Sequence, residues 1–197
     1  MGTLSDIGNI VGGSTPSKAK DEYFAYPRNG IAWITPKDLS INRDKYISHG
    51  EIDITNSGYK NSSTTLMPKD SVLFSSRAPI GYMAISKNEI CTNQGFKSIV
   101  PKAEIGTEYI YCLLKQNLAD IENLGSGSTF KEISGSVMKS IKVIIPDSKI
   151  LEHFRYACNP LFEQQSVVEM QNHLLSAIRN SLLPKLMSGE IEVKSVP

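Results

Sequence analysis

Short strand-like runs separated by polar turns make up the middle of the chain, residues 72–100, with the sequence VLFSSRAPIGYMAISKNEICTNQGFKSIV. The runs lie at residues 72–74, 82–85 and 96–100, and proline or glycine lies in the turns between them. Runs this short, bounded by Pro and Gly, are typical of strands joined by structured loops. The pattern therefore predicts a sheet whose loops carry an arginine and two side-chain amides.

Strands and helices are also predicted on both sides of this region. Residues 31–35 and 141–145 are apolar enough for strands, and a proline follows each of them. Residues 37–39 are expected to form a turn. Apolar residues at helical spacing predict a helix over residues 108–122, and a further helix is expected to begin at Thr55.

The chain changes character after residue 148. Residues 150–158 have a helical pattern, and Asn159 followed by Pro160 is typical of a cap and a first helical position. A second helix is therefore predicted from residue 161 to about residue 185, with Pro184 kinking or ending it. The apolar positions of this helix recur mostly every seven residues and are Leu161, Val168, Leu175, Ile178, Leu182 and Leu186.

These elements predict a mixed α/β (α+β) domain at residues 1–148, followed by a helical segment at residues 149–197. The seven-residue spacing favours a coiled coil that pairs two copies of the chain as a homodimer. Packing on the chain's own domain, or on another protein, is the alternative use of the same residues.

Composition narrows the class of protein. Hydrophobic residues make up 40% of the 197 residues, which is enough for a packed core. The 21 basic and 20 acidic residues give a net charge of +1, so the chain is no polybasic binder, although a local basic face remains compatible with nucleic acid. The three cysteines, Cys91, Cys112 and Cys158, are far apart and odd in number, which favours reduced thiols.

The sequence shows no segment of 18 continuous apolar residues, and residues 1–11 lack the apolar run of a signal peptide. A cytoplasmic protein is therefore expected. No motif for a cofactor or a metal was found, and we expect neither.

The sequence motifs give little support to the hypothesis that the protein is an enzyme. His49, His153 and His173 lie in three different segments and are expected to be ordinary surface histidines. Asp147 and Lys149 have the Asp-x-Lys form of half a metal-dependent nuclease motif, so a small nuclease is kept as an alternative.

The loop at residues 125–129 resembles a phosphate cradle but lacks the Gly-Lys-Ser/Thr ending of a P-loop. It is either a flexible connector or a loop whose Ser128, Thr129 and Lys131 grip a nucleic-acid phosphate.

Arginine, asparagine and glutamine on stiff loops indicate a surface that reads DNA. Their paired hydrogen-bonding groups match guanine and adenine edges in the major groove. Arg77 could instead bind loop carbonyl groups, and Asn93 and Gln94 could satisfy their own turn. The predicted DNA-binding residues are polar or basic positions on the loops: Thr15, Lys18, Lys37, Arg43, Lys60, Ser76, Arg77, Asn93, Gln94, Lys97, Ser128, Thr129 and Lys131.

A set of motifs in fixed order carries a family resemblance. They are LSDIG at residues 4–8, GSTPS at 13–17, WITPKDL at 33–39, VLFSSRAPIG at 72–81, TNQGFK at 92–97, GSTFKEI at 127–133 and LLPKLMSGEI at 182–191. This combination, which covers nearly the whole chain, resembles the DNA-specificity (S) subunit of type I restriction-modification systems.

The resemblance implies a non-catalytic protein that recognises double-stranded DNA as the specificity subunit of such a complex. Methyltransferase (M) subunits would dock on it and carry out DNA methylation, and through them the restriction (R) subunit would join. The matched loops at residues 75–81 and 92–97 would then support the structure and bind DNA phosphates. The bases would be recognised by residues 18–30 and 40–65.

Two departures from the family pattern bear on this expectation. Typical S subunits are about twice as long and hold two target recognition domains separated by paired antiparallel helices. A Leu-Phe-Glu-Gln-Gln run, similar to a form usual in the family, occurs here at residues 161–165 and not directly after Pro146. The chain is therefore expected to be a half-sized subunit that reads one half-site per copy and forms a homodimer. A truncated half with only partner-binding activity is the alternative.

Overall fold

A computed structural model describes residues 1–127 and 131–192. The chain divides into two compact units, Met1–Asn159 and Pro160–Pro197. The first unit contains sheets and short helices, and one long helix runs from its end into the second unit. The predicted mixed α/β class with a long C-terminal helix is thereby confirmed.

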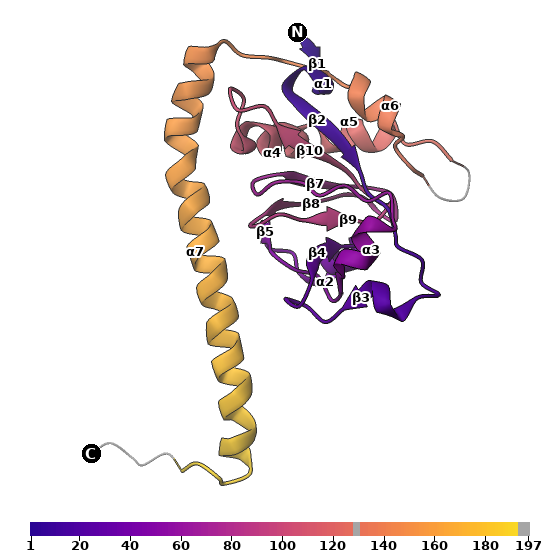
Figure 1. Cartoon of the computed structure of the whole chain (residues 1–197). Coiled ribbons are helices and arrows are strands. Elements are labelled where there is room, and N and C mark those ends of the chain that lie inside the picture. Colours follow the sequence, from indigo (N-terminus) through magenta and orange to yellow (C-terminus); the bar gives the residue numbers. More distant parts are fainter. Residues whose placement is uncertain (128–130, 193–197) are drawn as a thin grey trace. The chain divides into compact units, whose positions relative to one another are not determined.

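The predicted sheet around residues 72–100 is the centre of a five-stranded sheet in the described part of the first unit. In spatial order its strands are β2 (Gly8–Gly12), β10 (Lys97–Pro101), β7 (Val72–Ser76), β8 (Ile80–Ser86) and β5 (Tyr46–Ile47). β5 pairs parallel with β8, and the other pairs are antiparallel. Figure 1 shows β2, β10, β7 and β8 lying one beside the next.

A second sheet determines which loops meet. Its strands, in spatial order, are β3 (Phe24–Ala25), β6 (Asp53–Ile54), β4 (Ile31–Ile34) and β9 (Cys91–Thr92). β4 and β9 are parallel, with Trp33 opposite Cys91 and Ile34 opposite Thr92. Because parallel strands end at the same edge of a sheet, the segments that follow them, residues 35–38 and 93–96, leave side by side.

One hydrophobic core joins the two sheets. Ala32 and Ile34 from β4 pack in the same buried cluster as Leu73, Ala84 and Phe96, which lie on or beside the five-stranded sheet. Removing apolar side chains of this kind from water is the main driving force for folding. The shared core fixes the strand ends, and therefore the loops, of one sheet relative to the other.

Short helices and one further strand pair complete the first unit. β1 (Gly2–Thr3) pairs with β11 (Lys142–Val143), which is all that forms of the strand predicted at residues 141–145. The helices are α1 (Leu4–Ile7), the 3-10 helix η1 (Asp21–Tyr23), α2 (Pro36–Ile41), α3 (Asn56–Lys60), α4 (Thr107–Gln116), α5 (Leu118–Asn123) and α6 (Gly135–Ser140).

Two sequence predictions in this region need correction. Residues 37–39 belong to helix α2 and form no turn, because Thr35 and Asp38 make a capping box and Pro36 occupies the first turn. The helix predicted over residues 108–122 is divided into α4 and α5 at Asn117, whose side chain donates a hydrogen bond to the Leu113 carbonyl. Thr55 caps α3 through a hydrogen bond from Gly58 N, as predicted.

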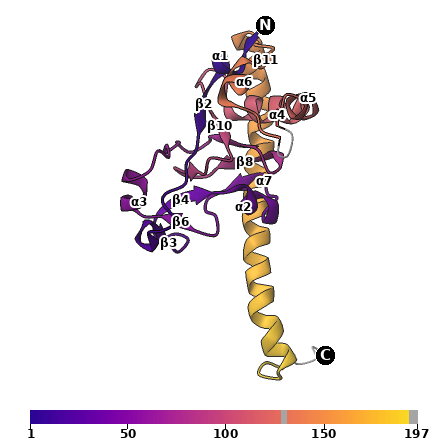
Figure 2. The ribbon, with the colours of Figure 1, turned by 90° about the vertical axis from the view of Figure 1, so that its right-hand side faces the viewer.

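The C-terminal helix α7 (Ser148–Met187) is one continuous helix, which also corrects the predicted break at Asn159 and Pro160. Both Pro160 and Pro184 lie inside it, and Figure 2 shows the ribbon running on without interruption. A proline in a helix interior removes one backbone hydrogen bond, and the bonds on either side maintain α7. Gly189, with φ of 74°, follows its end.

The first turns of α7 belong to the first unit and are anchored there. Arg155 Nη2 donates a hydrogen bond of 2.8 Å to the Ala103 carbonyl, and the rings of Phe154 and Tyr109 meet edge to face with centroids 5.9 Å apart. Among the described residues, no helix combines the length and apolarity that crossing a bilayer requires.

Candidate nucleic-acid interface

The ends of β4 and β9 and two neighbouring loops surround a hollow of about 780 Å³. Phe24 and Trp33, whose ring centroids are 6.0 Å apart, contribute apolar surface to its lining. Six of the predicted DNA-binding residues line it: Thr15, Lys18, Lys37, Arg77, Asn93 and Gln94. The structure therefore brings together side chains that lie up to 79 positions apart in the sequence, as Thr15 and Gln94 do.

The segment with Thr15 is held against β9 by backbone contact. Ser14 N donates to the Thr92 carbonyl at 2.9 Å, and the Trp33 indole donates to the Ser14 carbonyl at 3.0 Å. A side chain at Gly13 would overlap the carbonyl oxygens of Thr92 and Asn93, so only glycine allows this approach. As a result the Thr15 hydroxyl donates a hydrogen bond to Oε1 of Gln94.

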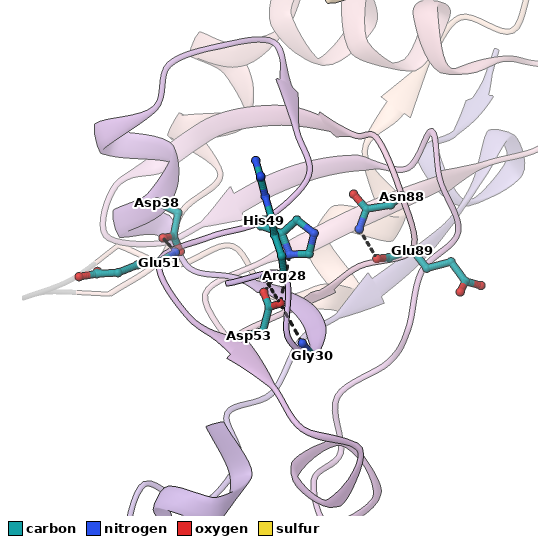
Figure 3. A network of polar contacts seen from close by, with 8 residues as sticks. All are labelled: Arg28, Gly30, Asp38, His49, Glu51, Asp53, Asn88 and Glu89. Atoms are coloured by element: carbon teal, nitrogen blue, oxygen red, sulfur yellow. Dashed lines mark hydrogen bonds and ion pairs between the residues drawn. The ribbon is translucent and has the colours of Figure 1, made fainter. Parts of the chain in front are cut away.

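Lys37 projects from the first turn of α2 and forms an ion pair. Its Nζ lies 2.6 Å from Oε2 of Glu51, and this hydrogen bond raises the pKa of the lysine. The buried Asp38 accepts hydrogen bonds from Thr35 N and from Glu51 N, at 2.7 and 2.8 Å. Figure 3 shows the Glu51 side chain directed away from the Asp38 carboxyl group.

Arg77 lies on the turn between β7 and β8, which the adjacent Ser75 fixes. The Ser75 hydroxyl donates to the Pro79 carbonyl and accepts from Tyr82 N, both at 2.8 Å. The peptide bond between Ala78 and Pro79 is cis. Nη1 of Arg77 lies 3.3 Å from Oε2 of Glu132, so the arginine binds a side chain, in contrast to the alternative that it binds loop carbonyl groups.

Lys97 and Asn93 make contacts that also stabilise the loops. Nζ of Lys97 lies 3.6 Å from Oε1 of Glu132, so one carboxylate bridges two cations. Asn93 Oδ1 accepts a hydrogen bond of 2.8 Å from Gly95 N, which is the self-satisfied turn considered as its alternative role. The amide of Gln94 is exposed beside it.

The remaining predicted residues lie elsewhere. Ser76 is fully buried and its hydroxyl donates to the Gly95 carbonyl, so it supports the turn of Arg77 and is not placed to touch DNA directly. Arg43, Lys60 and Lys131 are exposed but do not line the hollow. Ser128 and Thr129 lie outside the described residues.

A second loop, residues 26–30, is fixed by a buried carboxyl group that the sequence analysis did not single out. Asp53 has no exposed surface and accepts hydrogen bonds from Arg28 N at 2.7 Å and Gly30 N at 3.3 Å, as Figure 3 shows. Nδ1 of His49 lies 3.0 Å from Oδ1 of Asp53. His49 is therefore a partner of a buried acid, which corrects its expected role as an ordinary surface histidine.

The loop itself is exposed although its backbone is held. Arg28 has φ of 70°, a conformation uncommon for residues with a side chain, and Tyr26 is 83% exposed. The loop falls within residues 18–30, one of the two segments to which base choice was assigned. The Asp–His pair behind it could not be found from spacing, because neither residue forms part of a motif.

The residues considered for other chemistry have structural roles. Asp147 Oδ1 accepts a hydrogen bond of 3.0 Å from Ile150 N and thus caps α7, which gives the proposed nuclease carboxylate a different function. Within the described residues, no three His, Cys, Asp or Glu side chains cluster as a metal site would require. The three cysteines are free thiols.

The apolar positions of α7 predicted to pair are exposed. Leu161, Val168, Leu175, Ile178, Leu182 and Leu186 range from 40% exposed at Leu186 to 64% at Leu161. At 100° per residue, the seven-residue spacing places them along one side of the helix.

Comparison with known proteins gives relatives for this chain. The type I restriction enzyme MjaIX specificity subunit of Methanocaldococcus jannaschii is 44% identical over 145 residues, which are 73% of this chain and 33% of that protein. The type I restriction enzyme HindI specificity subunit of Haemophilus influenzae is 29% identical over 194 residues, 97% of this chain and 41% of that protein. The chain thus spans less than half the length of these relatives.

A solved structure has the same fold. The HsdS subunit from Thermoanaerobacter tengcongensis superposes with a TM-score of 0.62 at 14% identity, over 96% of this chain and 45% of that one. The family model for the type I restriction modification DNA specificity domain matches residues 1–184. This match extends over most of the chain, which therefore belongs to the family of type I restriction-modification DNA specificity domains.

Proposed function

We propose that the chain recognises double-stranded DNA in a sequence-specific manner, as the non-catalytic specificity subunit of a type I restriction-modification complex. The observation that carries this proposal is the hollow, because six of the predicted DNA-binding residues from separate segments line it. A guanidinium group, two amides and two lysines converge there on loops that β4, β7, β8, β9 and β10 hold in place.

The chemistry of these groups suits DNA. Arg77 donates through Nη1 to Glu132, and among the described residues Nε and Nη2 remain as a donor pair of the kind that binds O6 and N7 of guanine. Lys18 and Lys37 are exposed point charges suited to phosphate oxygens. Arg43, Lys60, Lys97 and Lys131 remain predicted contacts, and we assign base choice mainly to residues 18–30 and 40–65.

The names of the relatives support a proposal about protein partners. Both relatives are specificity subunits of type I restriction enzymes. We propose that methyltransferase subunits dock on this chain and methylate DNA at the site it selects, and that the restriction subunit joins through them. The free thiols favour a cytoplasmic location. The proposal requires no cofactor bound to this chain.

We further propose that two copies form a homodimer through α7. The apolar side chains from Leu161 to Leu186 are 40% to 64% exposed along one side of α7, and a coiled coil with a second copy would bury them. A dimer with two-fold symmetry would read a palindromic, interrupted target, one half-site per chain, with the helices setting the gap.

Methylation sequencing is the experiment that tests the function. A host carrying this chain with its partner methyltransferase should show one methylated motif, and that motif should be palindromic if the homodimer forms. Purified protein should then bind a duplex with the motif more tightly than a scrambled duplex. Absence of any motif-dependent methylation or binding would contradict DNA recognition, and cleavage of DNA with magnesium but without partner subunits would favour the nuclease.

A further inference from the structure

We propose that Glu132 is a specificity-determining residue, which orients Arg77 toward bases and withholds Arg77 and Lys97 from the phosphates of random DNA. This inference rests on the proposed DNA recognition and assigns a role to a residue outside the predicted contacts. Its basis is the carboxylate that lies 3.3 Å from Nη1 of Arg77 and 3.6 Å from Nζ of Lys97.

The position of Glu132 is set by the backbone on both sides. Glu132 N and the Glu132 carbonyl exchange hydrogen bonds with Ser126, at 2.9 and 3.1 Å. Ile133 N donates to the Ser76 carbonyl at 3.0 Å, and the Ile133 side chain is fully buried. The carboxylate therefore stands at a fixed place beside Arg77, unlike a side chain on a free surface loop.

The cation partners are positioned as firmly as the carboxylate. Arg77 follows Ser76, which is buried and bonded to the Gly95 carbonyl. The Lys97 side chain is only 18% exposed. Three segments distant in sequence thus present two positive charges and one negative charge at one edge of the hollow.

This charge arrangement bears on non-specific binding, which depends on the number of cations that replace counterions on the phosphates. A carboxylate between Arg77 and Lys97 lowers the positive potential that random DNA meets. Glu51 pairs with Lys37 in the same way at 2.6 Å, and both residues line the hollow. A cognate base, in contrast, can bind the Nε and Nη2 donors of Arg77, which no other described residue uses, without breaking the contact with Glu132.

Glu132→Gln tests the proposal, because glutamine keeps the size of the side chain and an acceptor oxygen but not the charge. We expect affinity for random duplex to rise and its salt dependence to steepen by about one to two phosphate contacts. Because Arg77 is then less firmly oriented, the ratio of cognate to random affinity should fall about tenfold. Fluorescence anisotropy over a series of salt concentrations measures both quantities.

Matched variants distinguish this role from general charge or stability effects. Glu51→Gln frees only Lys37, a proposed phosphate contact, and should raise both affinities equally, leaving their ratio unchanged. Glu104→Gln removes one exposed charge outside the hollow and should change little. Urea unfolding should give the same midpoint for Glu132→Gln and the parent protein, because the backbone bonds of residue 132 remain.

Two results would overturn the inference. One is a ratio of cognate to random affinity that Glu132→Gln leaves unchanged or raises. The other is an Arg77→Ala/Glu132→Gln double variant whose ratio is the product of those of the single variants, since residues that act together must show coupling. Failure of the parent protein to prefer any duplex would instead contradict the proposed function itself.

Discussion

The carboxylate of Glu132 lies 3.3 Å from Nη1 of Arg77, although 55 positions separate the two residues in the sequence. This contact joins the turn between β7 and β8 to the segment that precedes α6, and the neighbouring backbone pairs fix both. Arg77 is therefore oriented by a residue that is distant in sequence. Substitution of Arg77 or of Glu132 can test the role of this contact.

Arg77→Ala should weaken binding to the cognate duplex far more than binding to random DNA. Loss of a bidentate contact with a base costs about 1–3 kcal/mol, whereas loss of one phosphate contact acts on all sequences alike. Competition binding with cognate and scrambled duplexes measures the difference. Equal losses on both duplexes would reduce Arg77 to a phosphate contact.

Lys37→Ala provides the complementary case. Because its charge suits phosphate, affinity for cognate and random DNA should fall together, and the slope of log affinity against log salt should decrease by about one. A loss confined to the cognate duplex would instead assign base reading to Lys37.

Asp53→Ala should destabilise the first unit strongly. The variant removes the carboxylate that accepts partly buried hydrogen bonds from His49 and from the amides of Arg28 and Gly30. A hydrogen bond to a charged group contributes about 1.5–3 kcal/mol to stability. Urea denaturation followed by Trp33 fluorescence measures the loss, and Asp120→Ala on the exposed face of α5 should change stability by less than about 0.5 kcal/mol.

The buried thiol of Cys91 predicts a loss of stability at alkaline pH. Burial raises its pKa from the ordinary 9.0 to about 11, opposed by a hydrogen bond with Thr64. The unfolded chain releases this proton at lower pH than the folded chain, so the free energy of unfolding should fall as the pH rises from about 9 to about 11. Cys91→Ala should lose less stability over this window than the parent protein, and an equal loss would exclude Cys91 as the cause.

Leu175→Asp should shift the proposed homodimer toward monomer. A charge in the middle of the apolar stripe opposes burial against a second copy. Asn180→Asp is the matched control, because residue 180 lies on the other side of the helix from Leu175 and Leu182 at 100° per residue. Sedimentation velocity at high micromolar concentration measures the change, and a parent protein that is monomeric with and without methyltransferase subunits would contradict the dimer.

The strands at residues 31–35 and within residues 72–100 could be predicted because each is a short apolar run bounded by turn residues. The convergence of Arg77, Lys37, Asn93 and Gln94 was not predicted, because it depends on the parallel pairing of β4 with β9. Errors arose where two local signals competed. Pro160 after Asn159 is typical of a helix start, yet α7 passes through both. Contacts of its first turns, such as Phe154 with Tyr109, are tertiary and leave no mark in the local pattern.

The roles of the acidic residues Glu132 and Asp53 also left no local signal in the sequence. Glu132 and Asp53 act on residues far away in the sequence or on backbone amides, so neither their spacing nor their type indicates a partner. Helix α2 was misassigned for a different reason. Thr35, Pro36 and Asp38 carry a complete start signal, but the helix they begin is only six residues long.

The Asp53 anchor has a consequence for how such a protein could change its target. Its carboxyl group holds residues 26–30 through amides that every residue except proline possesses, and it makes no demand on their side chains. Tyr26, Arg28 and Asn29 can therefore be exchanged while the loop keeps its path, provided that position 28 accepts a positive φ. Substitutions in this loop could therefore change the DNA target without altering the sheets that support the loop.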